Sequence, residues 1–166
     1  MSTSLHRKIP VMLVVLGLAG FAIGSYLAIA HWGHQPIACG GVGDCGYVNS
    51  SEYASVGGIP VAGLGASLYL AMAITAVAWM RHADVDWLPI AYWGLALAGA
   101  GYAGYLTYVE LDVLHAICIW CVTSATLLTI SLVLASIAVF IEPEEESEAV
   151  LRAKDGLNIG SAIRQK

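Results

Sequence analysis

The chain has 166 residues, of which 58% are hydrophobic and 11% are charged, and its net charge is -5 at pH 7. About a quarter of the residues of a soluble globular domain are charged. The low charged fraction here, together with a mean hydropathy of +0.75, excludes a domain of that kind. The acidic balance gives no support to nucleic-acid binding. No stretch alternates apolar and polar residues over several strands, as a membrane β-barrel requires.

Four long apolar runs follow one another along the chain, at about residues 9–30, 60–80, 88–111 and 114–141. Each reaches the ~20 residues that a helix needs to cross the ~30 Å hydrocarbon core of a membrane. Backbone polar groups must be satisfied internally in lipid, which favours helices packed together. We therefore predict an all-α integral membrane protein, a four-transmembrane-helix bundle formed by residues 1–141.

The first run follows Arg7 and Lys8 and ends in small residues, a pattern that resembles a cleavable signal peptide. Its apolar part of about twenty residues exceeds the 7–15 residues of a signal peptide core, so we expect a retained span. Gly20, Gly24 and Ala28 recur at every fourth position of this run. That spacing predicts the close approach of a neighbouring helix.

A polar loop, residues 31–59, separates the first two runs and contains Cys39 and Cys45. Four glycines stand between and beside these cysteines, and glycine samples conformations closed to other residues. We therefore expect a mobile loop. Mobility suits a disulfide that shuttles between partners better than it suits a static, structural disulfide. Residues 47–55 then predict a short half-helix across the top of the bundle, and Pro60 is tolerated in the first turn of the second span.

The fourth run carries Cys118 and Cys121, which lie three residues apart and therefore share one face of a helix. A CxxC spacing allows a disulfide to open and close, and a helix start favours the thiolate form. A thiol slightly below the membrane surface reaches both the outer loop and a lipid-dissolved molecule such as a quinone. Just before this run, Glu110 and Asp112 are expected to end the third span in headgroup water.

The basic residues predict the orientation. By the positive-inside rule, both termini and the loop after the second run face the cytoplasm, and both cysteine pairs lie at the outer face of the cell (inner) membrane. Residues 142–166, which include five glutamates, predict a solvated acidic cytoplasmic tail. The seven basic residues are Arg7, Lys8, Arg81, Arg152, Lys154, Arg164 and Lys166.

Several motifs together resemble the vitamin K epoxide reductase (VKOR) family, and specifically its bacterial and archaeal members. They are the two loop cysteines, a Val-x-Ser-Ser segment, Gly-Ile-Pro before the second span, Gly65 and Tyr69 within it, and the Cys-x-x-Cys of the last span. The resemblance runs from about Pro10 to Phe140. It implies a four-helix bundle around a quinone, ubiquinone or menaquinone, that accepts electrons while disulfides are made for secreted proteins.

The resemblance also implies a role for each cysteine. Cys118 and Cys121 would be the active-site pair, with Cys121 nearer the quinone; Cys45 would exchange with Cys118, and Cys39 would meet an external thioredoxin-like partner. Ser51 matches a hydroxyl position of the family and is a candidate quinone contact.

Two departures from the family pattern are visible. Ala125 stands where vertebrate members have a tyrosine, which argues against vitamin K epoxide as a substrate. The thioredoxin-like domain fused to many bacterial members is absent from this sequence, so a separate exported thioredoxin-fold partner is expected.

Other functions remain open for the four cysteines. They could form structural disulfides in a non-catalytic helical bundle. They could pass a soft metal such as mercury inward, since thiolates prefer soft ions, although uptake calls for a pair placed deeper or on the cytoplasmic side. Zinc binding by all four thiolates is disfavoured by the five residues between the loop cysteines, so we predict no metal site. A different four-span quinone-linked disulfide generator has both its pairs in outer loops, whereas one pair here is predicted on a helix.

Overall fold

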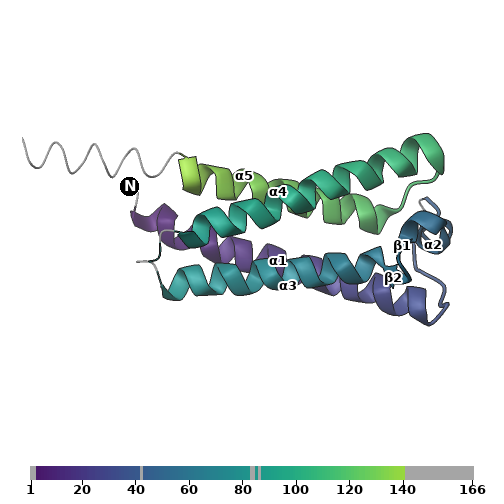
Figure 1. Cartoon of the computed structure of the whole chain (residues 1–166), viewed down its shortest axis with the longest axis horizontal. Coiled ribbons are helices and arrows are strands. Elements are labelled where there is room, and N and C mark those ends of the chain that lie inside the picture. Colours follow the sequence, from purple (N-terminus) through teal and green to yellow (C-terminus); the bar gives the residue numbers. More distant parts are fainter. Residues whose placement is uncertain (1–2, 42, 83–84, 86, 141–166) are drawn as a thin grey trace, which may run out of the picture.

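The computed structural model describes residues 3–41, 43–82, 85 and 87–140. Four long helices run along one another, and the short elements gather at one end of the bundle (Figure 1). In chain order the elements are α1 (Thr3–Trp32), α2 (Cys45–Ser50), the 3-10 turn η1 (Glu52–Ala54), β1 (Ser55–Val56), β2 (Ile59–Pro60), α3 (Val61–Arg81), α4 (Trp87–Tyr108), the π-helical turn η2 (Val109–Val113) and α5 (Ile119–Phe140). β1 and β2 form an antiparallel pair that leads the chain into α3.

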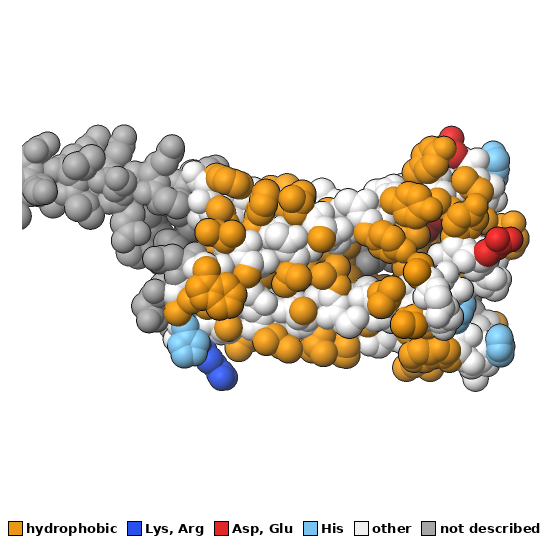
Figure 2. Space-filling model, viewed as in Figure 1, with side chains coloured by type: hydrophobic (Ala, Val, Ile, Leu, Met, Phe, Trp, Pro, Cys, Tyr) orange, Lys and Arg blue, Asp and Glu red, His pale blue; other side chains and the backbone are white. Residues whose placement is uncertain are grey.

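Three helices in the described part of the chain are long and apolar enough to cross a membrane: Lys8–Trp32, Val61–Arg81 and Ile119–Phe140. α4 has 22 residues, but its tyrosines, tryptophans and glycines lower its hydropathy, so the span predicted at 88–111 stays a prediction. Hydrophobic side chains cover the length of the bundle, whereas the visible acidic side chains lie at the end that carries α2 (Figure 2). This distribution is that of a helical membrane protein.

α1 packs along α3, and α4 packs along α5. The predicted close approach on α1 is confirmed: a Cβ at Gly24 would lie 2.9 Å from the Ala66 backbone nitrogen, and one at Gly20 would overlap the Tyr69 ring. Gly24 therefore allows α1 and α3 to touch through their backbones, and Gly20 makes room for the Tyr69 ring.

Buried side chains form two separate clusters. The larger one fills the bundle between the four long helices and includes Tyr69, Tyr92 and Leu128. The smaller one consists of Cys45, Val48 and Cys118 and lies at the end that carries α2. Both cysteine pairs are therefore at the same end of the molecule, while α3 ends with Arg81 at the other.

The fourth helix starts later than the predicted residue 114. α5 begins at Ile119, because His115 adopts a φ of 50°, outside the right-handed helical region, and the Ala116 N–H donates to the Glu110 carbonyl (3.1 Å). The predicted half-helix is present as α2 followed by η1. The predicted acidic tail, residues 142–166, lies outside the described residues.

Candidate active site

The loop cysteines are joined: Cys39 and Cys45 form a disulfide, with their Cα atoms 6.0 Å apart. Cys45 is the first residue of α2 and is buried, while Cys39 is half-buried. Asp44 caps this short helix by accepting the Tyr47 N–H (3.0 Å) on its carboxylate. The Asp44 cap thus fixes the start of α2 and with it the position of Cys45.

The backbone conformation of the loop explains its glycines. Gly40, Gly41 and Gly43 all have positive φ, at 62°, 79° and 77°, a region that side chains disfavour. Next to Gly43, the Asp44 N–H donates to the Ile117 carbonyl oxygen (3.0 Å). The loop is therefore tied to the segment just before the CxxC pair, and its mobility stays a prediction.

Trp120 forms a second tie between the loop and the CxxC segment. Its indole N–H donates to the Ala38 carbonyl (2.9 Å), and its ring contacts that of Tyr26, with centroids 5.4 Å apart. The Tyr26 hydroxyl in turn accepts the Ala38 N–H (3.2 Å). Sequence reasoning gave Trp120 no defined role, because neither contact is local in sequence.

The CxxC pair lies where α5 begins. Cys118 is fully buried directly before the helix, Cys121 is half-buried in its first turn, and both are free thiols. The Cys121 N–H donates to the Cys118 sulfur (3.4 Å), and the Val122 N–H donates to the Cys118 carbonyl (3.0 Å). The Cys118 carbonyl thus accepts the first i→i−4 bond of α5, and its sulfur accepts an N–H group that the helix start leaves without a helical partner.

Glu110 is the site residue that the sequence analysis missed. Instead of lying in headgroup water it is only 4% exposed, and its carboxylate accepts the Cys118 N–H (3.2 Å). A Glu110 oxygen and the sulfurs of Cys118 and Cys121 all lie within 4.8 Å of one another. The available signal was its position, since an acidic residue within a membrane segment marks a functional site by default.

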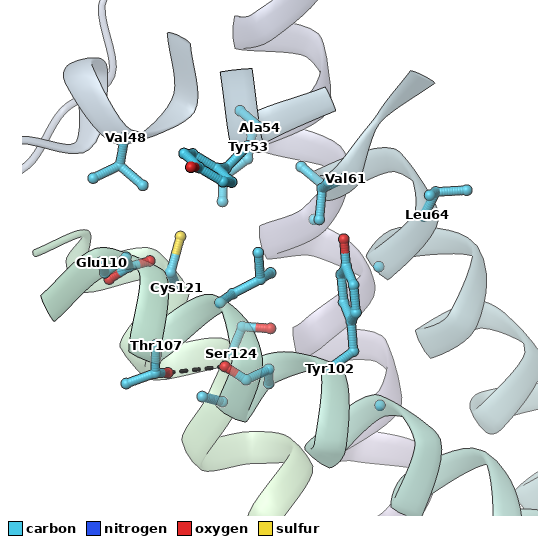
Figure 3. A pocket seen from close by; sticks show the side chains of 18 of the residues that line it. Val48, Tyr53, Ala54, Val61, Leu64, Tyr102, Thr107, Glu110, Cys121 and Ser124 are labelled. Atoms are coloured by element: carbon cyan, nitrogen blue, oxygen red, sulfur yellow. Dashed lines mark hydrogen bonds between the residues drawn. The ribbon is translucent and has the colours of Figure 1, made fainter. Parts of the chain in front are cut away.

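A pocket of about 370 Å³ opens beside Cys121. Its volume and mostly apolar lining fit a small-molecule site. In Figure 3 the Cys121 sulfur points into this pocket, on the side of Val48, and the side chain of Glu110 lies next to it. All four long helices, together with α2 and η1, contribute walls, among them Leu27, Tyr53, Leu68, Tyr102, Leu106 and Leu128.

A few polar groups also reach the pocket. The Tyr69 hydroxyl donates to the Ser124 carbonyl (2.8 Å) and lies 3.0 Å from the Ser124 hydroxyl. Ser51 lines the pocket and donates its hydroxyl proton to the Val48 carbonyl (2.8 Å), so that its oxygen lone pairs remain available. Its predicted quinone contact stays a prediction.

A sequence model of the vitamin K epoxide reductase family matches residues 11–136. The match covers α3, α4, most of α1 and α5, the loop disulfide and the CxxC pair. The chain belongs to this family, which makes it a membrane oxidoreductase and confirms the resemblance seen in its motifs.

Proposed function

We propose that this protein oxidises an exported thioredoxin-fold partner through Cys39 and Cys45, passes the electrons to Cys118 and Cys121, and reduces a membrane quinone. In the first step two partner thiols become a disulfide and the loop disulfide becomes two thiols. In the second step the loop pair is reoxidised as the CxxC disulfide opens. The third step returns the CxxC pair to a disulfide and converts the quinone to a quinol, which supports disulfide formation in secreted proteins.

One observation carries this proposal: the two members of the CxxC pair face different surroundings. Cys118 is buried in one cluster with Cys45, the loop cysteine that would exchange with it. Cys121 lines the apolar pocket. Thiol exchange passes through a mixed disulfide, so a pair with one sulfur toward each reactant suits a relay.

The pocket residues fit a quinone substrate. An apolar wall with few polar groups suits a lipid-soluble ring, and the Tyr102 hydroxyl in this wall is a donor for a quinone oxygen. The predicted Ser51 contact would require its hydroxyl proton to turn from the Val48 carbonyl to the quinone. When bound, the quinone would supply the two-electron acceptor. The chain supplies the thiols, and the surrounding helices shield them from water.

The arrangement of the cysteines argues against soft-metal uptake. All four cysteines of the chain lie at the same end of the bundle, so none is placed at the Arg81 end to release an ion there. Uptake would need a thiol ligand at that second end.

Quinone dependence is the direct test. The purified protein is expected to oxidise a reduced thioredoxin-like substrate only when a soluble quinone analogue is supplied, and Cys121→Ala is expected to abolish quinone reduction. Ser67→Ala, which changes an exposed hydroxyl on α3, is the matched control and should turn over normally. Undiminished quinone-dependent turnover in Cys121→Ala would refute this mechanism.

Orientation is tested separately. With both termini in the cytoplasm, a membrane-impermeant maleimide added outside intact cells should label reduced Cys39 or Cys45. It should miss a cysteine engineered beside Arg81, which lies at the opposite end of α3 from the loop. Labelling of the Arg81 site alone would invert the topology and place the partner in the cytoplasm.

A further inference from the structure

Glu110 is a buried carboxyl group with no lysine or arginine near it in the sequence. Its side chain is 4% exposed, and no lysine or arginine occurs between Arg81 and Arg152. The contacts that the structure gives it are the Cys118 N–H and the two thiols. Burying an ionisable group costs free energy unless it is paired or hydrogen-bonded. A glutamate at this buried position therefore suggests a chemical role.

The backbone holds Glu110 firmly in this position. α4 widens into the π-helical turn η2 at Val109–Val113, a form that is rare and frequent at functional sites. The Leu114 N–H donates to the Val109 carbonyl (2.9 Å), and the Ala116 N–H donates to the Glu110 carbonyl (3.1 Å). These bonds aim the carboxylate at the start of α5, where the thiols lie.

Oxidising the CxxC pair requires an exit for protons. Two S–H bonds break, one S–S bond forms, and two electrons and two protons leave the pair. Cys118 has no exposed surface and is covered by Cys45 and Val48. Bulk water therefore does not reach its proton, and Glu110 is the acceptor that the structure places beside both sulfurs.

We propose that the Glu110 carboxylate is the proton acceptor of the CxxC pair and delivers both protons toward the pocket. This inference rests on the proposed quinone reduction. In it the two electrons of the thiols go to the quinone, each thiol proton passes in turn to Glu110, and each then goes to one quinone oxygen. Glu110 ends as the carboxylate with which it began, so the balance closes as dithiol plus quinone giving disulfide plus quinol.

A purely structural role for Glu110 makes a different prediction. Its carboxylate also bonds the N–H of Cys118, the residue directly before α5, as a helix cap does. The Glu110→Gln variant separates the roles, because the amide oxygen still accepts the Cys118 N–H but the side chain no longer takes a proton. Asp112→Asn is the matched control, since Asp112 belongs to the same turn and is exposed.

The first experiment follows quinone reduction by the reduced protein in a single turnover. General bases contribute 10²–10⁴-fold, so Glu110→Gln should be slower by about 100-fold or more at neutral pH, with the quinone concentration for half-maximal rate unchanged. Glu110→Asp should recover part of the rate, and Asp112→Asn should match the unsubstituted protein. A wild-type rate in Glu110→Gln would overturn the proposal.

The pH profile separates proton transfer from capping. Without the base, turnover needs a thiolate formed by hydroxide at Cys121, which is half-buried and lines the pocket. The Glu110→Gln rate should therefore rise by about tenfold per pH unit below the usual pKa of a thiol. The other titratable groups around the pocket are Tyr53, Tyr69 and Tyr102. These tyrosines and the Cys45 thiol of the reduced protein are common to the unsubstituted protein and both Glu110 variants, so a difference between their pH profiles reports on residue 110. A slow rate without recovery at high pH, and without recovery in Glu110→Asp, would assign Glu110 to capping alone.

A second readout needs no quinone. Infrared spectra of the reduced protein report the S–H stretching bands, which shift when a thiol donates to a carboxylate. Glu110→Gln should move the band that Cys121→Ser removes, and Asp112→Asn should leave it in place. If Glu110→Gln leaves the S–H bands unchanged, the proposal is overturned. If the unsubstituted protein does not reduce quinone but Glu110→Gln still shifts the band, the proposed function fails while the thiol–carboxylate contact stands.

Discussion

The two cysteine pairs lie at the same end of the bundle, yet they are held by different kinds of backbone. Cys39 and Cys45 lie in a loop with three left-handed glycines and are joined by a disulfide. Cys118 and Cys121 are reduced and lie at the start of a 22-residue helix. The difference separates the pair suited to meeting a soluble partner from the pair fixed against the apolar pocket.

The largest effect is expected where the two pairs meet. If Cys45 exchanges with Cys118, then Cys121→Ser removes the sulfur that resolves the mixed disulfide, and a Cys45–Cys118 link should accumulate as the main species. The shared burial of these two residues favours this pairing. Mass mapping after a non-reducing gel measures it, and Cys39→Ser is the control, since it should lose exchange with the partner but keep quinone-driven oxidation of the CxxC pair.

The same experiment has an outcome that breaks the comparison. A link between Cys39 and Cys118 in Cys121→Ser would exchange the roles of the two loop cysteines. Cys39 would then be the member that moves onto the helix, and the buried Cys45 would have to meet the partner.

A smaller effect is expected where the loop is tied to the CxxC segment. An alanine in the left-handed region costs roughly 1–2 kcal/mol, and at Gly43 its Cβ would also overlap the Ile117 carbonyl oxygen. Gly41→Ala is the matched control, because Gly41 has a similar φ but open space around it. Losing the adjacent Asp44–Ile117 hydrogen bond costs a further ~1–3 kcal/mol.

The measurement is the rate at which reduced loop cysteines pass electrons to an oxidised CxxC pair. Gly43→Ala should be slower than Gly41→Ala by about tenfold, since 1.4 kcal/mol corresponds to that factor. Equal rates in the two variants would show that the Ile117 contact does not position the loop for transfer.

Apolar periodicity and cysteine spacing predicted much of this molecule, for local reasons. The run at 9–30 falls within α1, and the run at 60–80 starts one residue before α3 and otherwise falls within it. Small residues at every fourth position predicted the contact between these helices. The start of α5 was wrong by five residues, because a hydrophobic segment does not reveal that His115 leaves the helical conformation.

Local sequence patterns did not predict the surroundings of the Cys118 and Cys121 thiols. Glu110 was assigned to headgroup water since it follows a long apolar run, but the π-helical turn η2 points it inward at residues that come later in the chain. The pocket likewise collects side chains from α1 to α5. Both features depend on packing between distant segments, which hydropathy along one helix does not report.

The smallest effect is expected at Trp120, whose hydrogen bond to Ala38 joins the two regions. Trp120→Phe keeps an aromatic ring near Tyr26 but removes the donor, and a net hydrogen bond is worth about 1 kcal/mol, so the undocked loop should become roughly fivefold more populated. In a Cys39→Ser background, maleimide labelling of the buried Cys45 thiol should speed up by that factor. Trp87→Phe, an exposed residue at the start of α4, is the control and should not change the rate. Equal labelling in both variants would mean that Trp120 does not hold the loop down, leaving the Asp44–Ile117 bond as the contact that docks it.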